Sequence, residues 1–230
     1  MSRDRRDPGR RWTGGPPGRP EGASSRPAPG SARATGPRVV HPIEVESYRR
    51  MRALIDLGDL PPLSRAVAER IIHASADLDY AADLVLDEDA LARGVTALRA
   101  GGPIVADSRM VAAGITTRQV RCALDHPKVA ALAADLGLTR SAAGMLLAAE
   151  DGQPGTVYVV GNAPTALFAL LEAGVEPALI VGLPVGFVDA VESKQALRDS
   201  GLPSLTNLGP KGGSAVAAAA VNALLYLEEP

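Results

Sequence analysis

Three times in the second half of the chain, a short apolar run ends in glycine, proline or asparagine and the sequence then restarts as a helix. Runs of this length, bounded by such residues, predict a buried strand, a tight loop and a helix start. Strands that alternate with helices predict a parallel sheet, in which the loops after the strands share one edge. Sheets of this kind bind ligands at that edge. The three units span residues 157–165, 179–187 and 205–214.

Further elements are predicted upstream of these units. Asp87 is a predicted N-cap, Pro61-Pro62 suits a helix start, and Gly101-Gly102 ends a helix. The order of elements predicts one three-layer α/β domain over residues 41–230, with N-terminal helices followed by a mostly parallel sheet of about five strands. Helices are predicted over residues 43–57, 63–75, 87–100, 128–136 and 139–149, a single helical turn over 108–113, and strands over 103–107 and 118–124.

The first 40 residues differ sharply in composition from the rest. They hold nine arginines against three acidic residues, with seven glycines and seven prolines, so they carry about +6 while the remainder carries about −8. A segment this poor in large apolar residues cannot offset its ordering entropy, and we predict a disordered tail over residues 1–40. An arginine-rich arm could bind nucleic acid, but the interleaved proline and glycine favour a tail without that role, so no nucleic-acid partner is expected.

Composition also limits the compartment and the chemistry. The single cysteine, Cys122, excludes an internal disulfide and fits a reducing, cytoplasmic setting. No apolar run approaches the roughly 20 residues that span a bilayer, so no membrane partner is expected. Because the chain has only three dispersed histidines and one cysteine, we predict no resident metal.

Among the histidines, His73 is the candidate for proton chemistry. It follows Ile71-Ile72 at a predicted helix end, where the helix dipole favours a protonated imidazole, and Asp77 nearby could do the same. The alternative is a histidine that only caps its own helix. His41 at the edge of the tail and His126 in an Asp-His-Pro turn are predicted to be solvated.

The predicted loops suit anions rather than a nucleophile or a nucleotide. The chain has no Gly-x-Ser-x-Gly elbow, Walker A pattern or full Gly-x-Gly-x-x-Gly fingerprint. Helix starts offer free N–H groups and a positive dipole end, although ordinary capping is the alternative. Lys194 lies on the helix after one loop, facing either a ligand or solvent. The loop candidates are Thr139, Arg140, Ser141, Thr165, Lys211, Gly212, Gly213 and Ser214.

Six motifs follow one another in the folded part of the chain. They are Ile72-His73-Ala74-Ser75-Ala76-Asp77, Asp107-Ser108-Arg109-Met110-Val111-Ala112-Ala113-Gly114-Ile115, Thr139-Arg140-Ser141-Ala142-Ala143, Gly161-Asn162-Ala163-Pro164-Thr165-Ala166-Leu167, Pro184-Val185-Gly186-Phe187-Val188 through Glu192-Ser193-Lys194, and Lys211-Gly212-Gly213-Ser214 with Val221-Asn222-Ala223-Leu224. In this order they resemble the precorrin-8X methylmutase family, over about residues 43–227. One departure is Pro210, which stands where the family usually carries a basic residue.

The resemblance implies a flavodoxin-like domain, a homodimer and an active site near the dimer interface. It implies an isomerase of cobalamin biosynthesis that moves a methyl group from C-11 to C-12 of precorrin-8X, or of cobalt-precorrin-8, giving hydrogenobyrinic or cobyrinic acid without a cofactor. His73 matches the catalytic histidine, Ser47 the serine of the first helix, and Arg140 the active-site arginine. The substrate-binding residues it suggests are Ser75, Thr139, Ser141, Gly161, Asn162, Thr165, Gly186, Lys194, Lys211, Gly212, Gly213 and Ser214.

This chemistry suits the residues. A sigmatropic methyl shift is helped by protonating the conjugated system, and histidine donates protons well near neutral pH. Met110, Leu146 or Phe187 could form a wall for the macrocycle, although packing in the core is the favoured interpretation of all three. The product could pass to other enzymes of the corrin pathway. The alternative functions are a non-catalytic tetrapyrrole carrier, which Pro210 motivates, and a nucleotide-dependent enzyme, which rests on fold analogy alone.

Overall fold

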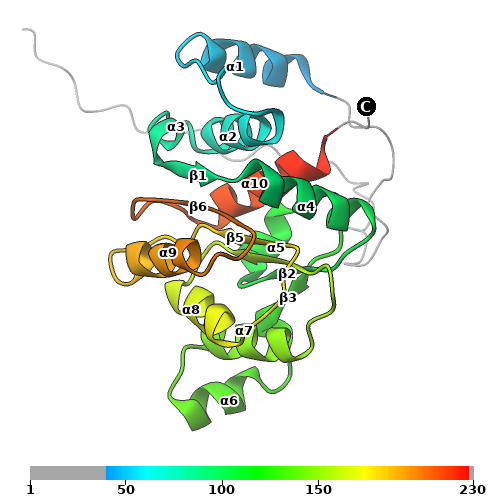
Figure 1. Ribbon diagram of the computed structural model, residues 1–230, viewed down its shortest axis with the longest axis vertical. Helices are drawn as coiled ribbons and strands as arrows, with labels where there is room; N and C mark the ends of the chain where they lie inside the picture. Colours follow the sequence, from blue (N-terminus) through cyan, green and yellow to red (C-terminus); the bar gives the residue numbers. More distant parts are fainter. Residues whose placement is uncertain (1–39, 228–230) are drawn as a thin grey trace, which may run out of the picture. The chain divides into compact units, whose positions relative to one another are not determined.

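A six-stranded sheet, five of whose strands run parallel, organises the computed structural model, which describes residues 40–227 (Figure 1). The strand order is β1-β6-β5-β4-β2-β3, and only β1 pairs antiparallel, with β6. The predicted α/β class with a mostly parallel sheet is confirmed. The strands are β1 (Leu84–Leu86), β2 (Ile104–Ala106), β3 (Arg121–Cys122), β4 (Val157–Val160), β5 (Leu179–Gly182) and β6 (Ser204–Asn207).

Helices cover both faces of this sheet. One layer holds α2, α4, α5 and α10, with α1 and α3 next to α2, and the other holds α7, α8 and α9, with α6 next to α7 (Figure 1). The helices are α1 (Pro42–Arg52), α2 (Pro62–Ser75), α3 (Tyr80–Asp83), α4 (Glu88–Arg99), α5 (Arg109–Gly114), α6 (Val129–Leu136), α7 (Arg140–Glu150), α8 (Pro164–Glu172), α9 (Ala190–Asp199) and α10 (Ser214–Leu225), with a 3₁₀ turn at Ala123–Asp125.

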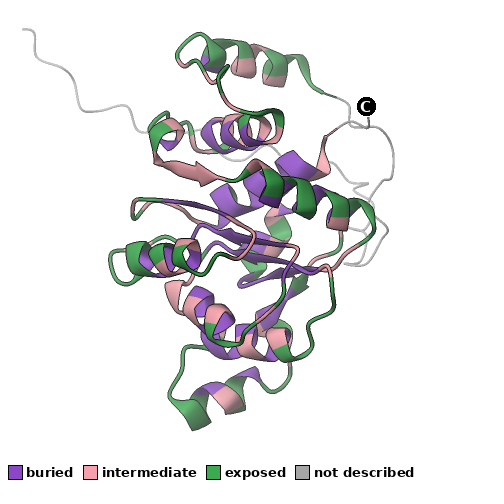
Figure 2. Ribbon diagram, viewed as in Figure 1, coloured by how far each residue is buried: buried purple, intermediate pink, exposed green. Residues whose placement is uncertain are grey.

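Alternation along the strands divides the core in two. Val157 and Val159 of β4 face the layer of α2, α4 and α10, whereas Tyr158 and Val160 face the layer of α7 and α8. The central strands β4 and β5 are buried on both faces, as Figure 2 shows in purple. Because side chains alternate across a pleated strand, one short apolar run supplies both cores.

Several elements differ from the sequence-based predictions, which also contained no helix at Tyr80–Asp83. The strand β1 was not predicted, since three residues between two helices carry too short a pattern. Helix α1 ends at Arg52 rather than near residue 57, and Asp56 accepts a hydrogen bond from the Gly58 amide at 2.8 Å in the turn that follows. The predicted strand over 118–124 shortens to Arg121–Cys122 because a 3₁₀ turn begins at Ala123.

The predicted disordered tail, residues 1–40, lies outside the described residues except for Val40. Within the described part of the chain, no single helix is long and apolar enough to cross a membrane. The bent pair α6–α7 matches a span in length and composition, with an angle of 114° between the two helices.

Candidate active site

His73 lies in the last turn of α2, half-buried beside α10. Val67 and Ile71 of α2 are fully buried, and this apolar face seats the helix against the core. The helix ends because Ala76 adopts the left-handed conformation, with φ of 54°. The buried stripe therefore fixes the position of the His73 backbone, and the side chain emerges at the margin of the packed face.

A cavity of about 770 Å³ opens beside His73. Three other cavities of the described chain are smaller, at about 380, 340 and 260 Å³. The volume of the cavity beside His73 lies in the upper part of the range that small-molecule sites span. The cavity is lined by His41, Ile43, Glu44, Ser47, Arg70, His73, Ala74, Gly114, Ala215, Ala218, Ala219 and Asn222.

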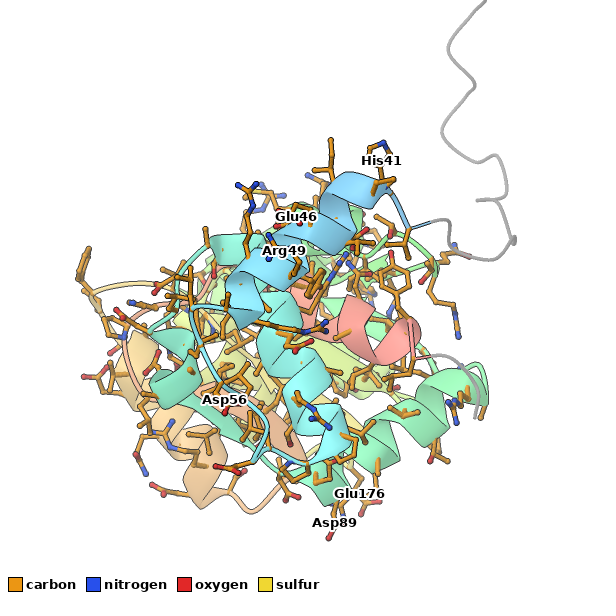
Figure 3. The ribbon with its side chains drawn as sticks, turned by 90° about the horizontal axis from the view of Figure 1, so that it is seen from above. His41, Glu46, Arg49, Asp56, Asp89 and Glu176 are labelled. Atoms are coloured by element: carbon orange, nitrogen blue, oxygen red, sulfur yellow. The ribbon has the colours of Figure 1, made fainter. Side chains whose placement is uncertain are left out.

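Helix α1 supplies one wall of this cavity. In Figure 3, seen from above, α1 lies over α2, with His41 at its N-terminal end and Arg49 on its outer side. Ser47 of α1 lines the same cavity as His73, although the two residues lie 26 positions apart, and the catalytic role that the resemblance implies for Ser47 stays a prediction. The Tyr48 ring stacks on the His73 imidazole, with centroids 4.3 Å apart and planes 4° from parallel.

Small side chains of α10 and the end of α5 form the opposite wall. Asn222 of α10 donates from Nδ2 to the Gly114 carbonyl at 2.8 Å and accepts from the Thr116 amide at 3.4 Å. A Cβ at Gly114 would lie 2.7 Å from the Ala218 Cβ, so only glycine permits this approach. The small alanine side chains of α10 thus leave room for the cavity, and Asn222 holds α10 against the end of α5.

Arg70 was missed by the sequence analysis. Its Nη1 donates to Glu44 Oε1 at 2.9 Å and to the Tyr48 hydroxyl at 3.3 Å. Both side chains of the Arg70–Glu44 pair are 21% exposed. Arg70 precedes His73 by three residues, and this spacing places both side chains on one face of a helix. The spacing could therefore have indicated from the sequence that Arg70 lies near His73.

The backbone amides of the loop after β4 bind a carboxylate of the protein itself, that of Asp107. The carboxylate of Asp107, fully buried at the end of β2, accepts from the amides of Gly161 at 3.1 Å, Asn162 at 2.8 Å and Ala163 at 2.9 Å. Burial raises the pKa of Asp107, and these three amides oppose that rise. The amides of Gly161 and Asn162 are therefore engaged within the protein, and the substrate contacts predicted for these two residues stay predictions.

Lys194 faces neither a ligand nor solvent, the two surroundings that the sequence predicted for it. Its side chain is fully buried, and its ammonium donates to Asn207 Oδ1 and the Lys211 carbonyl at 2.8 Å, and to the Gly209 carbonyl. The predicted substrate contact and the solvated surface are both wrong, because α9 packs this residue against the loop after β6. Lys194 holds that loop together.

Burial lowers the pKa of Lys194 to about 8, from the ordinary 10.5 of an unfolded lysine. Between these two values the unfolded chain binds more protons than the folded chain. The contribution of this group to the free energy of unfolding therefore rises with pH above 8, by up to about 1.4 kcal/mol per pH unit, and is flat below it.

We expect urea unfolding at pH 7 to 9.5 to show this rise. The stability gap between the wild type and Lys194→Met should stay constant from pH 7 to 7.5 and widen above pH 8. A gap that stays constant up to pH 9.5 would show that folding leaves the Lys194 pKa unchanged.

Lys211 is also engaged by the protein. Its ammonium donates to Asp77 Oδ2 at 2.7 Å and to Asp79 Oδ2 at 2.8 Å. These bonds raise the pKa of Lys211 and lower that of Asp77. The Asp77 carboxylate, predicted to support a charged His73, is thus paired with Lys211, and the pair ties the loop after α2 to the loop before α10.

The remaining loop candidates make contacts within the protein, and their substrate-binding roles stay predictions. A Cβ at Gly212 would lie 2.3 Å from the Leu183 carbonyl oxygen, and the Gly213 amide donates to that oxygen at 2.9 Å. Ser214 Oγ lies 3.4 Å from Ser108 Oγ. Ser75 donates to the Ile71 carbonyl at 2.8 Å, which caps its own helix. The Gly186 amide donates to the Pro210 carbonyl at 3.2 Å.

Thr139, Arg140, Ser141 and Thr165 lie together, away from the His73 cavity. Thr139 caps α7 through the Ala142 amide at 3.1 Å, and its hydroxyl lies 2.8 Å from that of Thr165. Arg140 is exposed and does not line the His73 cavity within one chain. Its catalytic role stays a prediction.

Two of the three proposed wall residues are not in the core. Phe187 is fully exposed and Met110 is 69% exposed, so the favoured core packing is wrong for both, whereas Leu146 is half-buried. Both exposed residues lie in segments that follow strands of the sheet.

His41 is exposed, as predicted, whereas His126 is half-buried. His41 is exposed and lines the His73 cavity, with its Nδ1 accepting from the Ile43 amide at 3.2 Å. His126 is half-buried and accepts from the Lys128 amide at 3.2 Å.

Comparison with known proteins identifies a single family. The model of the precorrin-8X methylmutase family matches residues 42–227. A precorrin-8X methylmutase of Pseudomonas aeruginosa is 47% identical over 191 residues, which cover 78% of this chain and 91% of that protein. A cobalt-precorrin-8 methylmutase of Methanocaldococcus jannaschii is 44% identical over 163 residues, covering 69% and 77%. The solved precorrin-8x methyl mutase of Thermus thermophilus superposes with a TM-score of 0.72 at 39% identity, covering 80% of this chain and 93% of that one.

Proposed function

Because the chain belongs to the precorrin-8X methylmutase family, whose members are isomerases of cobalamin biosynthesis, we propose that His73 is the proton donor for its intramolecular methyl shift. The supporting observation is the cavity of about 770 Å³ that His73 shares with Ser47 and Arg70. A histidine at the margin of a large cavity can reach a bulky substrate, and imidazole is the side chain best suited to proton donation near neutral pH.

The reaction balances without a donor or an oxidant. The bond between C-11 and the methyl group breaks, a bond from that methyl group to C-12 forms, and the π electrons of the macrocycle rearrange. Protonation of the conjugated system by His73 makes the migration terminus more electron-poor. The same proton can return to the imidazole when the product is complete, so substrate and product are isomers.

The macrocycle carries carboxylates, and cations of the chain would hold them. Arg70 lines the cavity, and Ser47 adds a hydroxyl. Arg140 is exposed at the start of α7, where a substrate larger than one cavity could reach it, and it keeps its proposed role in catalysis. Binding through several anchors positions the migrating carbon, which is the main contribution a protein makes to a unimolecular step.

We also propose a cytoplasmic homodimer with its active site close to the dimer interface, from which the product passes to other corrin-pathway enzymes. The exposed apolar side chains of Phe187 and Val188, 103% and 75% exposed, support a partner on that loop. Light scattering should give a dimer mass for the wild type, and Phe187→Glu should shift it toward the monomer. A wild-type monomer at micromolar concentration would contradict the dimer.

The direct test mixes purified protein with precorrin-8X and, separately, with cobalt-precorrin-8. We expect the absorption spectrum of one or both mixtures to change with time to that of the rearranged product. A coloured complex whose spectrum does not change would instead indicate a carrier that binds the tetrapyrrole. The faster of the two conversions identifies whether the natural substrate holds cobalt.

A further inference from the structure

The helix that carries His73 does not by itself fix the plane of the imidazole. The second side-chain torsion of a histidine is broad and roughly two-fold, so the ring can rotate unless a neighbour restrains it. Proton donation depends on the direction of the N–H bond, and small misplacements are costly in rate. A group that restrains the ring is therefore part of the site even when it touches no substrate.

The Tyr48 ring makes such a contact. It lies parallel to the imidazole within 4°, with centroids 4.3 Å apart, and it comes from α1 rather than from the helix of His73. Aromatic pairs in offset-stacked contact gain about 0.5–1.5 kcal/mol beyond their burial. One face of the imidazole is covered in this way, and turning the ring out of this plane about its last torsion would break the stack, whereas a half-turn keeps the plane.

The Tyr48 ring is itself held on two sides. Arg70 Nη1 donates to its hydroxyl at 3.3 Å and to Glu44 at 2.9 Å, and the Arg52 guanidinium carbon lies 5.5 Å from the ring centroid. Arg52 is fixed in turn by a two-bond pair with Glu69, at 2.7 and 2.6 Å. Both arginines tie α1 to α2, so the position of the Tyr48 ring follows that of the helix bearing His73.

We propose that Tyr48 is a positioning residue for His73, fixing the imidazole plane so that its N–H bond points into the cavity. The inference rests on the proposed role of His73 as proton donor. Since Ser47 is the neighbour of Tyr48 on α1, the same stack keeps the Ser47 hydroxyl on the cavity wall. Tyr48 itself need not touch the macrocycle.

The test compares Tyr48→Leu, which removes the aromatic face, with Tyr48→Phe, which keeps it. We expect kcat of the Leu variant to fall about tenfold, while KM and product affinity stay within about twofold. The Phe variant should retain kcat within about threefold. Equal losses in both variants would assign the effect to the hydroxyl and would overturn the role of the stack.

Two further measurements separate positioning from general packing. In wild type and Tyr48→Phe, the carbon-bound protons of the His73 ring should show an upfield ring-current shift in ¹H–¹³C spectra, which Tyr48→Leu should lose. In a His73→Ala background, Tyr48→Leu should add no further loss of turnover. An unshifted wild-type ring, or a further tenfold loss without His73, would overturn the inference.

Tyr226→Leu is the matched control, because the Tyr226 ring contacts Arg70 at 5.5 Å from its guanidinium carbon. Its kcat should change less than threefold. Full turnover by His73→Ala would defeat the proposed function, whereas an inactive His73→Ala with a fully active Tyr48→Leu would defeat only this inference. If Tyr48→Leu fails to fold, the Phe variant and the wild-type spectrum still decide.

Discussion

Replacing His73 with alanine is expected to lower kcat for the methyl shift by at least about 100-fold, because a positioned acid contributes roughly 10²–10⁴-fold to a proton-dependent step. Product affinity should change little, since the anchors for the carboxylates remain. The side chain is half-buried at a helix end, so the fold should tolerate alanine. Single-turnover absorbance and a binding titration with the product measure the two effects separately.

His126→Ala provides the matched control for this prediction. His126 is also half-buried, but it accepts from the Lys128 amide and lines a different cavity, near Cys122. Its turnover should stay within about twofold of the wild type. If His73→Ala turns over at the wild-type rate, the proton must come from elsewhere and the proposed mechanism is wrong.

Replacing Lys194 with methionine is expected to lower the free energy of unfolding by roughly 3 kcal/mol at pH 7, because buried oxygens lose their donor. Methionine fills most of the space of the lysine stem but donates no hydrogen bond. Asn207 Nδ2 also donates to the Gly209 and Lys211 carbonyls, at 3.3 and 3.0 Å, so Asn207 Oδ1 suffers the greatest loss. Urea unfolding followed by far-ultraviolet circular dichroism measures the change.

Lys211→Met is the control, since it makes the same substitution on a surface-exposed pair. Its partners Asp77 and Asp79 remain in contact with water, with side chains 31% and 81% exposed, and its effect on stability should be far smaller. Equal losses for the two variants would mean that the buried network around Lys194 contributes no more than a surface ion pair.

Local patterns predicted much of the fold. Asp87 was predicted as an N-cap and accepts from the Asp89 and Ala90 amides at 2.9 and 3.2 Å. The three strand-loop-helix units occur as predicted, because apolar period and loop residues act over a few positions. The three-residue strand β1 and the true length of β3 were beyond such patterns, since pairing across the sheet decides where these strands form and end.

The sequence by itself determined the three strand-loop-helix units, the edge at which their loops gather, and His73 as the residue to examine. Only the tertiary structure decided which polar groups are already used within the protein. Asp107 meets the Gly161 amide across 54 positions, and Lys211 meets Asp77 across 134, so neither pairing leaves a local pattern. The same reason applies to the His73 site: α1 brings Tyr48 onto the imidazole through space, and contacts between distant segments depend on how the layers pack rather than on the residues adjacent in the chain.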